Sequence, residues 1–272
     1  MFEQVAIGVV GSVAATILVL LTRIGFYKVR DLFPARALFH GILGSDRACL
    51  VFILRMTDTE EKSEFKTPMP RYSVVVPQHA WDVRVNVPWV NSTSETQAVA
   101  HVLNVLGRAG RTKNIKLAFA DQDFDVWESP MFILGGSPKM IRAFANCNPY
   151  FELNGAQFIL KSTGEVYKPQ AIENDLGLLH KMINPSTGFP IWAAWGLRGA
   201  GTVAAAYALV RWWKELGILY GKSSFGVVVE LDDRDGWQQL RILRLYPEPR
   251  WHQKILHPIA WRVLSRDSSQ IS

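Results

Sequence analysis

The stretch IWAAWGLRGAGTVAAAYALVRWW, from Ile191 to Trp213, decides the fold. It permits three interpretations: a membrane span interrupted by Arg198, a strand and a helix joined by a tight turn, or a glycine-rich loop that holds an anion against a helix N-terminus. A span fits poorly, because an arginine near its centre costs about 2.5 to 3.5 kcal/mol on insertion scales. The sequence therefore predicts a strand followed by a helix from about Gly201 to Leu216.

The loop between that strand and helix has the composition of an anion site. Gly199 and Gly201 allow close backbone approach, Thr202 can cap the helix, and Arg198 adds a positive charge. The first N–H groups of a helix are unpaired and carry partial positive charge, which suits phosphate. The spacing G-x-x-G-x-G differs from the dinucleotide-binding fingerprint, so a plain tight turn with a surface arginine remains the alternative.

Apolar runs elsewhere in the chain alternate with helical patterns. The helices are predicted at 91–110, after Pro138 and after Gly201, and the strands at 47–55, 72–77, 114–121, 129–136, 155–169 as a hairpin, 176–183, 189–196, 223–231 and 240–246. Such alternation predicts an α/β, Rossmann-like domain with a mainly parallel sheet covered on both faces. Because helices are few, part of the sheet should be antiparallel. Two glycine loops after apolar strands suggest two similar halves.

The second glycine loop contains Gly135, Gly136 and Ser137, and Asp121 follows another predicted strand. Ligands of open α/β sheets bind outside the carboxyl ends of the strands. The predicted ligand-binding residues are therefore these four together with the loop that follows residue 196, namely Arg198, Gly199, Gly201 and Thr202. No metal-ligand spacing and no nucleophile elbow occurs in the sequence, so we predict neither a cofactor nor a catalytic set.

The N-terminal segment predicts a membrane anchor. Residues 4–22 contain no charged side chain, and about 19 apolar residues are enough to cross a hydrocarbon core of about 30 Å. Only Glu3 precedes this run, whereas basic residues follow it, namely Arg23, Lys28, Arg30 and Arg36. The positive-inside bias then places the N-terminus outside the inner membrane and the long C-terminal portion in the cytoplasm.

These observations divide the chain into a transmembrane anchor at 1–28, a juxtamembrane segment at 29–46, an α/β domain at 47–262 and a polar tail at 263–272. Within the anchor, small residues recur one turn apart (Gly8, Gly11, Ser12 and Ala15), the spacing that lets two membrane helices pack as a homo-oligomer. The net charge is +6, but the basic residues are scattered along the chain rather than gathered in one run, which argues against nucleic acid as a partner.

A membrane helix before a Rossmann-like domain with the loops FILGGSPK and GLRGAGT resembles the membrane-anchored nucleotide-sensor proteins of prokaryotic defence, which contain CARF-like or SLOG-like domains. The resemblance implies a domain that binds a nucleotide or related anionic signal at the strand ends and signals to its membrane helix. The alternatives are a membrane-tethered nucleotide or sugar-phosphate hydrolase and an interaction scaffold without a ligand. The glycine loops and Arg198 favour the sensor, since no coherent set of acid, base, metal and nucleophile is recognisable.

Overall fold

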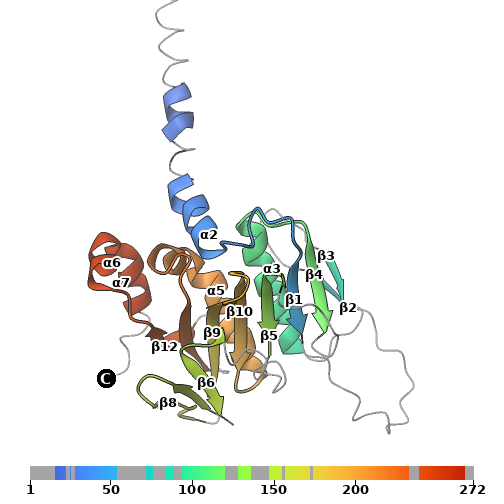
Figure 1. Cartoon of the computed structure of the whole chain (residues 1–272), viewed down its shortest axis with the longest axis vertical. Helices are drawn as coiled ribbons and strands as arrows, with labels where there is room; N and C mark the ends of the chain where they lie inside the picture. Colours follow the sequence, from blue (N-terminus) through green and yellow to red (C-terminus); the bar gives the residue numbers. More distant parts are fainter. Residues whose placement is uncertain are drawn as a thin grey trace, which may run out of the picture.

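The computed structural model of the chain describes residues 16–22, 25, 28–53, 72–75, 84–87, 93–119, 128–135, 147–154, 157–171, 174–232 and 239–266. These residues form an α/β fold around one large mixed sheet, with helices against one face and a small sheet against the other (Figure 1). The predicted fold class is thereby confirmed at the level of a mixed α/β domain.

The central sheet has the strand order β12-β11-β9-β10-β5-β1-β4. In chain order the strands are β1 (Cys49–Ile53), β4 (Ile115–Phe119), β5 (Met131–Leu134), β9 (Asn174–Ile183), β10 (Pro190–Gly196), β11 (Phe225–Asp232) and β12 (Arg241–Tyr246). Neighbours from β10 to β4 pair in parallel, whereas β9 and β12 run against their neighbours. Five strands therefore point one way, and the predicted antiparallel part lies on one side of the sheet.

Three helices cover one face of this sheet: α2 (Phe33–Leu38), α3 (Thr93–Arg108) and α5 (Gly199–Leu219). Strand side chains alternate between faces, so Trp192 and Ala194 of β10 pack on the helix side, while Ala193 and Trp195 face the opposite way. Both sets are buried. Burial on both faces explains why the strands appear in the sequence as continuous apolar runs.

The opposite face of the sheet is covered by a three-stranded antiparallel meander, which consists of β6 (Phe151–Asn154), β7 (Gln157–Leu160) and β8 (Glu165–Tyr167). Its buried residues Phe151, Phe158 and Leu160 pack against the central strands. The predicted hairpin corresponds to β7 and β8, whereas β6 was not predicted. A further antiparallel pair joins β2 (Tyr72–Val75) to β3 (Arg84–Val87).

At the N-terminal end, residues 16–22 are helical and the π-helix η1 (Lys28–Leu32) leads into α2. Figure 1 shows this segment, in blue, rising away from the domain beyond α2. Most of the predicted membrane anchor, including the four small residues of the proposed helix contact, lies outside the described residues. Among the helices that the structure describes, none combines the length and the apolar character needed to cross a bilayer.

The chain ends in two helices, α6 (Trp251–Leu256) and α7 (Pro258–Arg266), neither of which was predicted. Helix α7 continues across position 262, where the sequence suggested the end of the domain. Its side chains Ala260 and Leu264 are buried in the helix-side core, so this segment is an integral part of the fold.

Candidate functional site

The two glycine loops follow neighbouring parallel strands. Leu134 of β5 pairs with Ala194 of β10, and the N–H of Gly135 donates to the carbonyl oxygen of Ala194 at 3.0 Å. Gly135 has a φ of 83°, a left-handed conformation that favours glycine. The chain therefore leaves β5 and β10 at the same edge of the sheet.

The order in which strands are added to the sheet changes direction at β1. Strand β1 lies between β4 on one side and β5 on the other, so consecutive parallel strands are added first on one side of β1 and then on the other. In open α/β sheets, the crevice outside the carboxyl ends at such a switch point is the usual ligand site. The structure describes five of the predicted site residues (Gly135, Arg198, Gly199, Gly201 and Thr202), while Gly136, Ser137 and Asp121 lie outside the described residues.

A buried carboxylate occupies the N-terminus of α5. Asp175, at the start of β9, is 1% exposed, and its Oδ1 accepts hydrogen bonds from the backbone N–H groups of Leu176 at 2.8 Å and Arg198 at 3.2 Å. Its Oδ2 accepts one from the N–H of Gly201 at 2.5 Å. Asp175 therefore supplies, from within the chain, the negative charge that the helix N-terminus favours.

Arg198 is held beside the same carboxylate. Its Nε lies 3.8 Å from Oδ1 of Asp175, and its Nη2 donates to the carbonyl oxygen of Asn174. About half of the Arg198 side chain is exposed (49%). Burial raises the pKa of Asp175, opposed by the backbone N–H groups and the charge of Arg198.

The glycines of the loop allow the first turn of α5 to pack on the backbone of β9. A Cβ atom at Gly201 would overlap the carbonyl oxygen of Leu176, and one at Gly177 of β9 would overlap that of Gly201. A Cβ atom at Gly196 would likewise overlap the backbone around Thr202. The glycine pattern is thus required by close helix–strand contact, which is the geometry of the tight-turn alternative.

The predicted start of the helix is wrong by two residues. Helix α5 begins at Gly199 with Arg198 at its N-cap position, so Thr202 lies inside the first turn and does not cap it. The Thr202 side chain is buried. Of the predicted loop residues, Arg198 is therefore the one whose side chain has the charge and the exposure to meet an anion.

The N-terminus of α3 lies beside that of α5. A Cβ atom at Gly199 would come within 2.5 Å of the Ser94 hydroxyl oxygen in the first turn of α3, so the two helices touch at their starts. Burial raises the pKa of the neighbouring Glu95 to about 7. The sequence predicted α3 but gave no signal that its first turn would adjoin Arg198.

Two consecutive ionisable residues of β9 are fully buried away from this edge. Lys181 faces the helix side, where its Nζ donates to the carbonyl oxygen of Gly221 at 2.6 Å, and burial lowers its pKa to about 7. His180 faces the opposite layer beside Tyr150 and Phe151, and burial lowers its pKa to about 3. Both belong to the packed core and lie at the middle or far end of the strand from Asp175.

The described residues thus define an α/β domain whose mixed, mainly parallel sheet is compatible with a Rossmann-like arrangement. Comparison with protein-family models, with curated proteins and with solved structures found no match to this chain. Within the part of the chain that the structure describes, no group of three or more His, Cys, Asp and Glu side chains is placed to hold a metal ion.

Proposed function

We propose that this chain is a membrane-anchored sensor whose α/β domain binds an anionic, nucleotide-like small molecule beside Arg198 and signals through α5 to the N-terminal helix. The observation that carries this proposal is the position of α5. Its first turn lies at the carboxyl edge of the sheet, and its last turns contact the segment that leads to the N-terminal helix. A helix of 21 residues is about 30 Å long, so one rigid element joins both places.

The contact at the far end of α5 is close. A Cβ atom at Gly217 would come within 2.5 Å of the carbonyl oxygen of Pro34, so α2 packs directly on the backbone of α5. Only glycine fits at position 217, because any side chain there would push α2 and α5 apart. A shift of α5 would therefore be passed to α2 without intervening flexible side chains.

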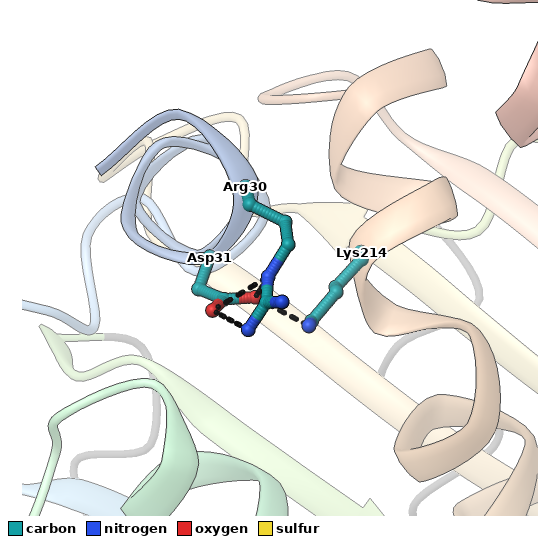
Figure 2. Close-up of polar contacts among 3 residues, drawn as sticks. All are labelled: Arg30, Asp31 and Lys214. Atoms are coloured by element: carbon teal, nitrogen blue, oxygen red, sulfur yellow. Dashed lines mark hydrogen bonds and ion pairs between the residues drawn. The ribbon is translucent and has the colours of Figure 1, made fainter. Parts of the chain in front are cut away.

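An ion-pair cluster joins the same end of α5 to the π-helix η1, which precedes α2. Figure 2 shows that the Asp31 carboxylate forms ion pairs with both Arg30 and Lys214, and that the Lys214 side chain extends toward it from α5. Partial burial pushes the pKa of Asp31 upward, but the hydrogen bonds from Arg30 and Lys214 outweigh this effect and hold the pKa below its ordinary value. The cluster fixes how the base of the N-terminal helix sits on α5.

The ligand site is proposed at the exposed side of Arg198, next to the first turn of α3. Since Asp175 already accepts the backbone N–H groups of α5, an incoming phosphate would compete with Asp175 for the guanidinium. A ligand can shift a conformational equilibrium only through such a difference in affinity between two states. This competition supplies a physical route from ligand binding to a change at the N-terminus of α5.

The N-terminal segment completes the proposal. The apolar run at 4–22 would span the inner membrane with the domain in the cytoplasm, and its small residues would allow protomers to associate. Each domain would consist of two similar halves. The side chains of residues 17–21, which the structure does describe, are exposed and apolar, as a lipid-facing helix requires. Protease added to intact cells should leave the domain whole, and its digestion without permeabilisation would contradict this orientation.

The ligand is tested with the full chain purified from its host in mild detergent. Native mass spectrometry would reveal a retained small molecule, and calorimetry with a nucleotide panel would measure its affinity. Replacing Arg198 with alanine removes a charge-assisted hydrogen bond of about 1.5 to 3 kcal/mol, so the affinity should fall roughly ten- to a hundredfold.

Arg211→Ala is the matched control for this experiment, because Arg211 is an exposed arginine on the same helix. Its substitution should leave the affinity unchanged. The proposal is wrong if no anionic molecule binds, or if the Arg198 variant binds its ligand as tightly as the unaltered chain.

A further inference from the structure

Large apolar side chains that are exposed to solvent gather at one end of the molecule. Among the described residues they belong to the N-terminal helix, to Phe33 at the start of α2, and to α6 and α7, with Val166 on β8 as the exception. On the two C-terminal helices they are Trp251, Ile255, Leu256, Ile259 and Val263, of which Ile259 is 80% exposed. Single exposed apolar residues are ordinary, but a contiguous group marks an interaction surface.

Contacts with α5 place the C-terminal helices at the same end as the N-terminal helix. The Gln253 side chain donates to the carbonyl oxygen of Leu219 in the last turn of α5, at 2.6 Å. A pocket of about 290 Å³ between the helices is lined by Ile218 of α5 together with Leu256 and Ile259. Because α2 also packs on these last turns, α6 and α7 flank the base of the N-terminal helix, as Figure 1 shows.

Helix α7 has two apolar stripes, but only one is used within the fold. Ala260 and Leu264, one turn apart, are buried against the domain, while Ile259 and Val263 form a second stripe directed outward. On α6, Trp251 and Ile255 stand at the same spacing and are exposed. The outward stripe adds no stability to the isolated domain, so it needs another explanation.

The charges beside this stripe are positive. Residues 250–265 contain no Asp or Glu, whereas they include Arg250, Lys254 and Arg262. Two carboxylates lie close by: Glu248 stands 3.7 Å from Lys254, and Glu215 lines the pocket, where burial raises its pKa. An apolar stripe with Trp on one side and basic residues beside it is the pattern of a helix that lies in the interface of an anionic bilayer.

We infer that the outward face of α6 and α7, defined by Trp251, Ile255, Leu256, Ile259 and Val263, binds the surface of a membrane rich in anionic lipid. The two helices lie in the plane of the interface beside the base of the N-terminal helix, with Trp251 at headgroup depth. The inference rests on the membrane location in the proposed function but not on its ligand site. A second copy of the chain fits less well, because a symmetric contact would bring two basic surfaces together.

The position of this face is tested with the full chain reconstituted into vesicles of equimolar phosphatidylcholine and phosphatidylglycerol. Nitroxide labels are placed at Ile255→Cys and Ile259→Cys, with Val166→Cys as the matched control on the remote meander. The native Cys49 and Cys147 are both buried, and burial raises the pKa of the Cys49 thiol to about 12, which disfavours its labelling. To remove any background label, both are replaced by alanine in a common background whose melting curve is checked.

Labels at 255 and 259 should lose accessibility to a water-soluble nickel complex and gain accessibility to oxygen when vesicles are present. The label at 166 should remain accessible to nickel. In vesicles of phosphatidylcholine alone, nickel accessibility at 255 and 259 should return, since the basic residues no longer meet anionic lipid.

Three results would overturn the inference. If the chain floats with the vesicles while labels at 255 and 259 stay as nickel-accessible as the label at 166, the anchor holds but this face does not touch lipid. If the labels are protected without vesicles and show dipolar broadening, a second copy covers the face. If the chain does not float with vesicles at all, the membrane location fails together with this inference, whereas ligand binding at Arg198 is measured separately.

Discussion

Replacing Asp175 with alanine should destabilise the domain more than any other single charge removal that we consider. The substitution leaves the N–H groups of Leu176, Arg198 and Gly201 without their acceptor and deprives Arg198 of its buried counter-charge. An unsatisfied buried donor costs about 1 to 3 kcal/mol, and breaking a buried ion pair costs about 3 to 5 kcal/mol. Because Arg198 is half exposed and water can replace part of the loss, we expect about 3 to 4 kcal/mol.

Thermal unfolding followed by circular dichroism measures this effect. For a domain of this size, each kcal/mol lowers the melting temperature by about 2 to 4 °C, so the Asp175→Ala variant should melt roughly 6 to 16 °C lower. Glu152→Gln, at an exposed position on β6, is the control and should change stability by less than about 0.5 kcal/mol. A melting temperature for Asp175→Ala equal to that of the control would refute the argument that this carboxylate holds the start of α5.

Two further predictions concern other parts of the core. Gly201→Ala should separate α5 from β9 and destabilise the fold, because the added Cβ would overlap the Leu176 carbonyl oxygen. Gly107→Ala should instead stabilise the fold by about 0.5 to 1 kcal/mol, because a Cβ at this position in helix α3 would meet no atom within 4 Å. Urea denaturation compares the two variants. Lys181→Met should weaken the pH dependence of the free energy of unfolding. Burial lowers the pKa of Lys181 from its ordinary value of 10.5 to about 7, so the unfolded chain binds more protons than the folded chain between these values. The stability of the unaltered chain therefore rises with pH across that window. Urea midpoints at pH 7 and pH 10 should differ less in the methionine variant, and an unchanged difference would contradict the buried, neutralised lysine.

The sequence predicted the elements whose packing leaves a local signal. Strands buried on both faces, such as β9 and β10, appear as long apolar runs, and α5 follows a glycine break at once. The C-terminal helices left no such signal, because Pro258 interrupts the pattern and α7 is apolar on two faces. Strand β6 is short, with exposed residues alternating, and its place is set by contacts with strands far away in sequence.

The candidate site shows why a loop motif alone predicts ligand binding poorly. A glycine whose Cβ would collide with a ligand and a glycine whose Cβ would collide with a neighbouring strand look identical in the sequence. Here Gly201 faces Leu176 and Asp175, residues about 25 positions earlier, and no local pattern connects them. The sequence did contain one clue. Asp175 and Gly177 are two residues apart and therefore lie on the same face of β9, where both meet the start of α5.

If an anionic ligand competes with Asp175 for Arg198, then removing the charge of Asp175 while keeping its shape should strengthen binding. In Asp175→Asn one amide oxygen can still accept a backbone N–H, but the guanidinium loses the carboxylate that lies 3.8 Å from its Nε. The affinity measured by calorimetry should then rise about tenfold, the equivalent of about 1.4 kcal/mol, whereas Arg198→Ala lowers it. Opposite changes in ligand affinity in these two variants would show that Asp175 competes with the ligand for Arg198. If Asp175 only supported the loop, both variants would bind the ligand more weakly. A folded Asp175→Asn variant with unchanged or reduced affinity would show that the ligand does not draw on this ion pair.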